Sequence, residues 1–177
     1  MEGGTSVSDL VGNSAIKVTG RSNVLIHHCT FQHFSTMGVI FYSGANIPAK
    51  YPTGNKFYNN IMTNCSKMTP GDGNSGEGSL CIGSEHGMMV YNNTITCNLR
   101  SSGNNGYCIK YYGFDGLNKG LKIYNNTLTA DQCPSTGFNF AIEMWGSAGG
   151  CEIYNNTIKG TIDIPNSHKD LSWYGVP

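Results

Sequence analysis

The chain has 177 residues, with 11 basic and 11 acidic side chains, so its formal net charge at pH 7 is zero. Because the basic residues are scattered, neither nucleic acid nor an anionic membrane is favoured as a partner, and no apolar run approaches the roughly 18 residues that a membrane-spanning helix needs. With 24 glycines, 12% charged residues and no stretch of helical periodicity, the composition indicates one loop-rich domain that covers residues 1–177.

In chain order, the predicted elements are organised around a six-residue phrase that recurs through the sequence. The phrase reads Ile-Tyr-Asn-Asn-Thr-Ile in its last copy, and its first copy has His27, His28 and Cys29 in the middle. The copies are Ile26–Phe31, Phe57–Met62, Val90–Ile95, Ile123–Leu128 and Ile153–Ile158. Their second positions are 31, 33, 33 and 30 residues apart. A repeat of this length without a helical pattern predicts a solenoid of strands.

Apolar and polar residues alternate on both sides of each asparagine pair, which predicts two short, half-buried strands per copy. Since the next copy repeats the same order, we expect the chain to turn a corner at the pair and coil onward. Asparagine tolerates the left-handed backbone of such a corner, and stacked amides can hydrogen-bond from coil to coil. The two predicted columns are Asn59, Asn92, Asn125 and Asn155 beside Asn60, Asn93, Asn126 and Asn156. His27 and His28 are interpreted as substitutions at the first corner.

A third strand per coil is predicted between the phrases. Its inward columns are Ile16, Ile40, Leu80, Ile109, Ile142 and Ile162, followed by Val18, Tyr42, Ile82, Tyr111, Met144 and Ile164. Side chains alternate along a strand, so the residues between them face outward. The outward columns then hold Phe41, Lys110, Glu143 and Asp163, followed by Tyr112 and Trp145. Three strands per turn predict an all-β fold, a right-handed parallel β-helix of about five turns with asparagine-pair corners.

The sequence has seven cysteines, so at least one stays unpaired. Cys65 and Cys97 occupy the same slot one coil apart, where a disulfide and two stacked thiols are both compatible with the strand spacing. No cysteine or histidine spacing matches a zinc site. The acidic segment Asp72–Glu77 could hold calcium, although glycine-rich acidic loops are common without an ion. We therefore predict no metal and no cofactor.

The outward face of the third strand is the predicted binding surface, because the core and the corners take up the other positions. Tyr112 and Trp145 fall on successive turns, where aromatic rings on a rigid strand can stack against the apolar face of a sugar. The charged residues beside them could hydrogen-bond sugar hydroxyls, and two further aromatic residues extend the platform toward the amino end. The predicted ligand-binding residues are Tyr112, Trp145, Lys110, Glu143, Asp163, Phe41 and Tyr51. In the alternative interpretation, a long loop folds over these rings and buries them.

The same residues allow an enzymatic interpretation. Glu143 and Asp163 could be the carboxylate pair of a glycoside hydrolase, or they could hold calcium while Lys110 acts as the base of a polysaccharide lyase. Calcium takes about six to eight oxygen ligands, whereas the predicted register brings two carboxylates to this surface. A ladder of charges on a sheet is also common as a plain solvated surface, so we predict no catalytic residue.

The corner phrases at 26–31, 57–62, 90–95, 123–128 and 153–158 resemble those of the pectate-lyase-like right-handed β-helix superfamily over nearly the whole chain. That superfamily mostly acts on polysaccharides. Its enzymes generally have more turns, and they carry paired aspartates or a calcium cluster with an Arg or Lys base, neither of which has a clear match here. The short length and predicted exposed aromatics are more similar to the non-catalytic β-helical carbohydrate-binding modules of bacterial plant-cell-wall enzymes, a family associated with xylan.

The resemblance and the predicted surface together give the functional hypothesis. We expect a carbohydrate-binding module that binds a plant cell-wall polysaccharide such as xylan and targets a linked catalytic domain to it. The amino end shows no signal peptide, which fits either a cytosolic protein or a piece of a longer exported one. Of the two, we expect a domain excised from a longer, multidomain, secreted or cell-surface bacterial protein. The alternatives are a polysaccharide lyase or glycoside hydrolase, and a structural β-helix of an adhesin or fibre whose aromatics make subunit contacts.

Overall fold

The computed structural model describes residues 14–34, 37–42, 51–65, 78–83, 85–97, 106–112, 120–130, 139–145 and 150–164. The side chains of residues 106, 112 and 145 lie outside the described part. The described residues form strands joined by turns and bends, and no helix that could cross a membrane is found among them.

The strands form three sheets. Sheet I has the order β1 (Ile16–Thr19), β4 (Val39–Tyr42), β7 (Leu80–Gly83), β10 (Gly106–Tyr112), β13 (Asn139–Trp145) and β16 (Thr161–Asp163). Sheet II has the order β14 (Glu152–Tyr154), β11 (Lys122–Tyr124), β8 (Met89–Tyr91), β5 (Lys56–Tyr58) and β2 (Leu25–His27). Sheet III has the order β15 (Thr157–Lys159), β12 (Thr127–Thr129), β9 (Thr94–Thr96), β6 (Ile61–Thr63) and β3 (Thr30–Gln32).

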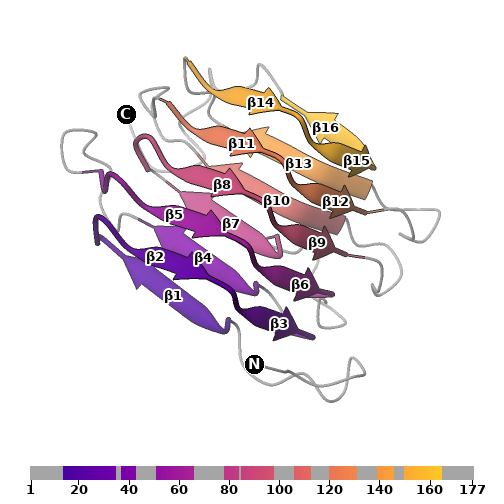
Figure 1. Cartoon of the computed structure of the whole chain (residues 1–177), viewed down its shortest axis with the longest axis horizontal. Helices are drawn as coiled ribbons and strands as arrows, with labels where there is room; N and C mark the ends of the chain where they lie inside the picture. Colours follow the sequence, from indigo (N-terminus) through magenta and orange to yellow (C-terminus); the bar gives the residue numbers. More distant parts are fainter. Residues whose placement is uncertain are drawn as a thin grey trace, which may run out of the picture.

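Neighbouring strands in each sheet are parallel and come from successive coils, so every complete coil gives one strand to each sheet, and β16 adds a sixth strand to sheet I (Figure 1). The coils stack from the N-terminal β1–β3 to the C-terminal β14–β16. This arrangement is a right-handed parallel β-helix with three strands per turn, which confirms the fold predicted from the repeated phrase.

The asparagine corners are built as the sequence predicts. The first asparagine of each pair has a left-handed backbone, with φ of 53° at Asn59 and 55° at Asn92, and His28 adopts the same conformation at 54° in the first coil. The second asparagine points inward and bonds to the coil before it. The Asn93 side chain accepts from the Asn60 N–H at 3.0 Å, and it donates to the Phe57 carbonyl at 3.0 Å. These bonds satisfy backbone groups at the corners of the first four coils.

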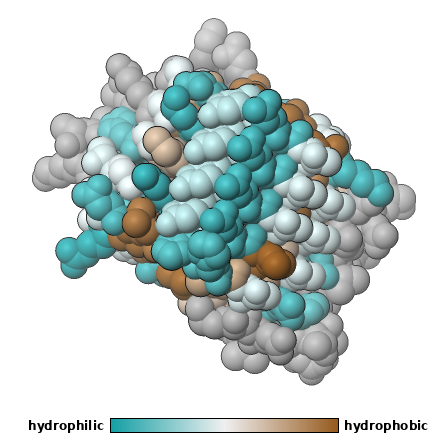
Figure 2. All heavy atoms as spheres, in the orientation of Figure 1, coloured by the Kyte–Doolittle hydropathy of each residue, from teal (hydrophilic) through white to brown (hydrophobic). Residues whose placement is uncertain are grey.

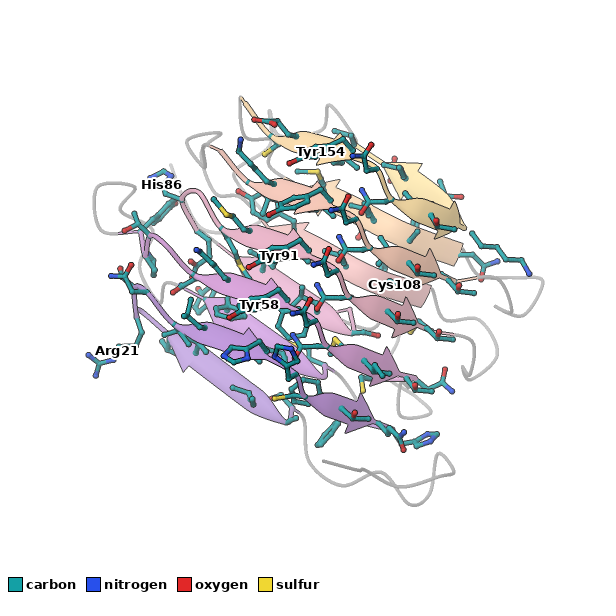
Figure 3. The ribbon with its side chains drawn as sticks, in the orientation of Figure 1. Arg21, Tyr58, His86, Tyr91, Cys108 and Tyr154 are labelled. Atoms are coloured by element: carbon teal, nitrogen blue, oxygen red, sulfur yellow. The ribbon has the colours of Figure 1, made fainter. Side chains whose placement is uncertain are left out.

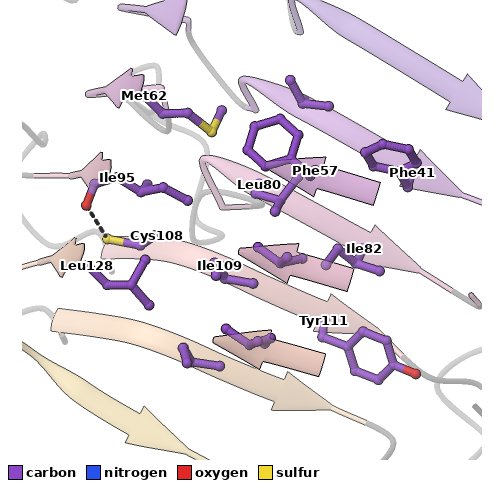
Figure 4. Packing of buried hydrophobic residues seen from close by; sticks show 14 of the residues in the cluster. Phe41, Phe57, Met62, Leu80, Ile82, Ile95, Cys108, Ile109, Tyr111 and Leu128 are labelled. Carbon is purple, nitrogen blue, oxygen red and sulfur yellow. Dashed lines mark hydrogen bonds between the residues drawn. The ribbon is translucent and has the colours of Figure 1, made fainter. Parts of the chain in front are cut away.

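The interior is a continuous apolar column with fully buried rungs (Figure 4). Its members include Phe31, Phe57, Met62, Val90, Ile95, Ile109, Ile123 and Leu128, all with no exposed surface. Cys65 and Cys97 both lie in this core and are not joined by a disulfide, so the stacked-thiol alternative holds. Another core thiol, Cys108, lies 3.4 Å from the carbonyl oxygen of Ile95.

One predicted register is wrong. Strand β4 pairs Phe41 with Val18 of β1 and with Ile82 of β7, so Phe41 belongs to an inward column and is fully buried. Ile40 and Tyr42 were predicted to face inward. They instead alternate along β4 with the buried Val39 and Phe41, and both are half-buried. The segment from 39 to 42 is apolar or aromatic throughout, so its sequence has no alternation from which to choose a face. In the later coils the predicted inward column of Leu80, Ile109 and Ile142 is confirmed.

Candidate functional site

The predicted platform residues Tyr112 and Trp145 are paired across β10 and β13, so they do lie on neighbouring rungs of sheet I. Their side chains are outside the described residues. The same register runs back through Gly83 to Tyr42, so this column contains Tyr42, which was predicted to lie in an inward column. A Cβ atom added at Gly83 would be 3.0 Å from the Tyr42 ring, so the ring lies over this glycine.

Lys110 and Glu143 occupy the predicted adjacent positions, but they are not open to a ligand. They are 5% and 4% exposed, and Lys110 Nζ lies 3.4 Å from Glu143 Oε2. The ammonium group also lies 4.3 Å from the centre of the Tyr107 ring, which stacks on Phe140 at 5.1 Å. A buried ion pair with a cation–π contact is a packed structural unit. These two residues therefore bind each other instead of presenting free groups to solvent.

The remaining predicted site residues lie in different surroundings. Asp163 follows Glu143 in the register and is half-buried. Tyr51 is 4% exposed, and its ring lies 5.1 Å from the ring of His86. Phe41 is in the core, as described above. The structure thus supports a shared column for the two platform aromatics and does not support the wider set of exposed neighbours.

Sequence reasoning missed a second aromatic column, on the outer side of sheet II. Four tyrosines stack rung on rung, with centroid separations of 4.8, 5.0 and 5.0 Å and interplanar angles of 4°, 7° and 1°. They are Tyr58, Tyr91, Tyr124 and Tyr154, and three are labelled in Figure 3. His27 continues the stack at 4.8 Å from Tyr58. Because the rings stack face to face along the helix axis, their edges meet the solvent.

Columns of polar residues run parallel to this tyrosine ladder. The corner residues Asn92, Asn125 and Asn155 are exposed, and beyond them sheet III carries outward threonines. The threonine columns are Thr30, Thr94, Thr127 and Thr157, with the exposed Ile61 between Thr30 and Thr94, then Thr63, Thr96 and Thr129. Figure 2 shows the parallel rows on this side of the molecule. We call the tyrosine, asparagine and threonine columns together the Tyr–Asn–Thr face.

The Tyr–Asn–Thr face is polar but carries little charge. Burial is the main cause that raises the pKa of the Tyr91 phenol above its ordinary value, with contributions from Tyr58 and Tyr124, so this hydroxyl stays neutral at physiological pH. At the edge of the face, Lys122 Nζ lies 2.8 Å from Glu152 Oε1. Each tyrosine follows a buried or half-buried Ile, Val or Phe in the sequence, and this alternation is enough to predict that the tyrosine faces outward. The prediction was not made, because the tyrosines served only to measure the repeat length.

A buried carboxyl group lies apart from both surfaces. Glu85 is 1% exposed, and Asn55 Nδ2 donates to its Oε2 at 2.7 Å. Asn55 also donates to the Arg21 carbonyl at 2.8 Å and accepts from the Val24 N–H at 2.8 Å, so it joins three successive coils. Burial raises the pKa of Glu85 to about 8, against an opposing hydrogen bond from Asn55. This group is therefore a protonated structural acid near neutral pH.

The described residues offer no built metal centre. His27 Nδ1 and His28 Nδ1 are 2.8 Å apart, which requires one ring nitrogen to donate and the other to accept. Within the described ranges, no group of three or more His, Cys, Asp or Glu side chains is arranged to hold a metal ion. The predicted calcium segment, Asp72–Glu77, lies outside the described residues.

The class of protein that these observations define is the right-handed parallel β-helix. Comparison with known protein families, with curated proteins and with solved structures found no match. The fold therefore rests on the strand register and the corners themselves, and the function has to be argued from the surfaces.

Proposed function

We propose that this domain is a non-catalytic polysaccharide-binding module, with a neutral plant cell-wall glycan such as xylan as the ligand. The observation that carries the proposal is the regular spacing of the Tyr–Asn–Thr face, whose rings repeat every 4.8–5.0 Å along the helix axis. This repeat is close to the length of one sugar unit in an extended β-linked chain. A linear glycan aligned with the axis would meet the same set of groups at each coil.

The groups on this face suit sugar hydroxyls and an uncharged chain. Asn125 and Thr127 of one coil, like Asn92 and Thr94 of the coil before, present amide and hydroxyl groups that can donate and accept. The tyrosine edges add apolar surface and a phenol hydroxyl at each rung. Since the strands are fixed by their ladders and corners, the face loses little conformational entropy on binding. A catalytic domain linked to such a module would be concentrated on its substrate.

The column of Tyr42, Gly83, Tyr112 and Trp145 on sheet I is the alternative location for the same activity. Its register favours an aromatic platform, as the sequence predicts. An enzymatic function has less support, because Lys110 and Glu143 are buried against each other, so neither is a free base or acid on an open face.

Affinity electrophoresis on xylans, pectins and alginate, combined with an assay for new reducing or unsaturated ends, tests the proposal. We expect retention on a neutral xylan without release of ends. The double variant Tyr91→Ala with Tyr124→Ala should weaken retention at least tenfold, whereas Trp145→Ala should leave it unchanged. The matched double variant with Phe at both positions keeps the ring stack and isolates the contribution of the hydroxyls.

The other outcomes reject the proposal in different ways. Loss of retention in Trp145→Ala alone would move the binding site to sheet I. Release of ends that disappears in Glu143→Gln would establish an enzyme. Absence of retention on every glycan would favour the structural role in an adhesin or fibre.

A further inference from the structure

The corner amides of the β-helix all point the same way along its axis. Each inner-corner asparagine accepts a hydrogen bond from the corner N–H of the preceding coil and donates to a carbonyl of that coil. Asn126, for example, accepts from the Asn93 N–H at 3.0 Å and donates to the Val90 carbonyl at 3.0 Å. Every coil therefore depends on the asparagine of the coil that follows it.

In the last described coil, no asparagine from a further described coil makes these two bonds. Asn156 accepts from the Asn126 N–H at 2.9 Å and donates to the Ile123 carbonyl at 2.9 Å, which completes the coil before it. The equivalent groups of its own coil are the Asn156 N–H and the Ile153 carbonyl. No described residue places an amide side chain against them, so among the described residues the ladder ends with one donor and one acceptor at this corner.

The apolar column is open at the same end. Ile123, Leu128 and Ile142 are fully buried, but the residues that continue their columns in the last coil are not. Ile153 and Ile158 are half-buried and Ile162 is 41% exposed. Strands β14, β15 and β16 are also the terminal members of their sheets, so each has an unpaired edge among the described strands (Figure 1).

The first coil is built differently. Its interior is closed, with Ile26 at 7% and Phe31 at 0% exposure. Cys29 takes the place of the inner asparagine, and its thiol lies 3.3 Å from the His27 carbonyl of its own coil. A second copy stacked with its first coil on the last coil would bring a thiol to the position that needs a carboxamide. Growth of a head-to-tail fibre by identical chains is therefore disfavoured.

We infer that the C-terminal end, formed by β14, β15 and β16, is a docking surface for a partner polypeptide that adds one more parallel β-coil with an asparagine at its inner corner. The partner's carboxamide would bond to the Asn156 N–H and the Ile153 carbonyl, its strands would pair with the three free edges, and its apolar residues would cover the open column.

A trans-complementation experiment tests this inference on the intact chain. The probe is a synthetic peptide of residues 120–130, which contains one complete corner with its inner asparagine, titrated into the ¹⁵N-labelled protein. We expect saturable shifts of the amide signals of Asn156 and of strands β14 and β15, with the signals of β2 and β3 unchanged. The same peptide with Asn126→Ala should bind at least about tenfold more weakly, because it cannot make the two corner bonds.

A protein variant locates the contact independently. Ile158→Lys should abolish the shifts, whereas Leu25→Lys, an equally charged change at the opposite end where Leu25 is 52% exposed, should not. The inference is overturned if no saturable shift occurs, if both peptides bind equally, or if the shifts map elsewhere. It is also overturned if sedimentation shows that the chain alone dimerises with the Asn156 amide buried, because a second copy would then be the occupant.

Discussion

Raising the pH from 4.5 to about 8 is expected to weaken the fold through Glu85. The pKa of this carboxyl group is raised from 4.5 to about 8 because the side chain is buried at the junction of three coils. The folded chain therefore keeps the proton between these two values while the unfolded chain releases it. In this interval, the free energy of unfolding should fall by about 1.4 kcal/mol for each pH unit.

The total effect follows from the two pKa values. The stabilising contribution of the proton is fully present below pH 4.5 and is lost as the pH rises to about 8, a change of about 5 kcal/mol. A loss of that size is a large fraction of the stability of a typical domain. Above pH 8, Glu85 is charged in both states, so this group adds no further dependence.

Urea denaturation between pH 4.5 and 9, followed by circular dichroism, measures this effect. The variant Glu85→Gln keeps a neutral acceptor for Asn55 and should remove most of the slope. Glu152→Gln is the control, because Glu152 lies on the surface with its side chain 50% exposed and should leave the slope unchanged. Parallel pH curves for the wild type and Glu85→Gln would refute the argument.

Three further predictions concern the ladder, the buried pair and the core thiols. Asn93→Ala should lower the free energy of unfolding, measured by urea denaturation, by about 2–4 kcal/mol, because it leaves a buried N–H and a buried carbonyl unsatisfied. Asn92→Gly, at the exposed left-handed corner, should lower it by about 1 kcal/mol or less. Glu143→Ala should lower the free energy of unfolding by about 3–5 kcal/mol, because it leaves the Lys110 charge buried without its carboxylate. Adding Lys110→Met should recover much of that loss, since it removes this charge. A double variant whose loss equals the sum of the two single losses would contradict this. Burial raises the pKa of the Cys65 thiol to about 11, so a thiol reagent at pH 7 should react with it only on unfolding, and rapid labelling of the native chain would show that the site is open.

Most of the fold could be predicted because the corner carries its own markers. Each corner needs one asparagine with a left-handed backbone and a second whose buried amide makes hydrogen bonds. The asparagine pair therefore recurs in the sequence once per coil. The prediction failed at β4, where Val39 to Tyr42 are apolar or aromatic without interruption and either face could be buried. The structure resolves the choice by placing the Phe41 ring inside and the hydroxyl-bearing Tyr42 outside.

The candidate site was less predictable because it depends on contacts beyond the strand period. Cys108 and Ile109 are adjacent in sequence and both lie in the core, so the inward–outward alternation is broken in strand β10. Tyr107 then falls beside the Lys110 ammonium group instead of continuing an inward column. A rule of period two does not allow two adjacent residues to face inward, and it therefore could not predict that the charged pair is buried.

The one-way orientation of the corner amides gives the chain a built-in order of assembly. During synthesis, the residues of each coil emerge before the asparagine that completes their polar groups, and that asparagine always arrives with the very next coil. Deleting an internal coil would bring two compatible neighbours together, whereas reversing the order of the phrase within one coil would leave two coils without partners.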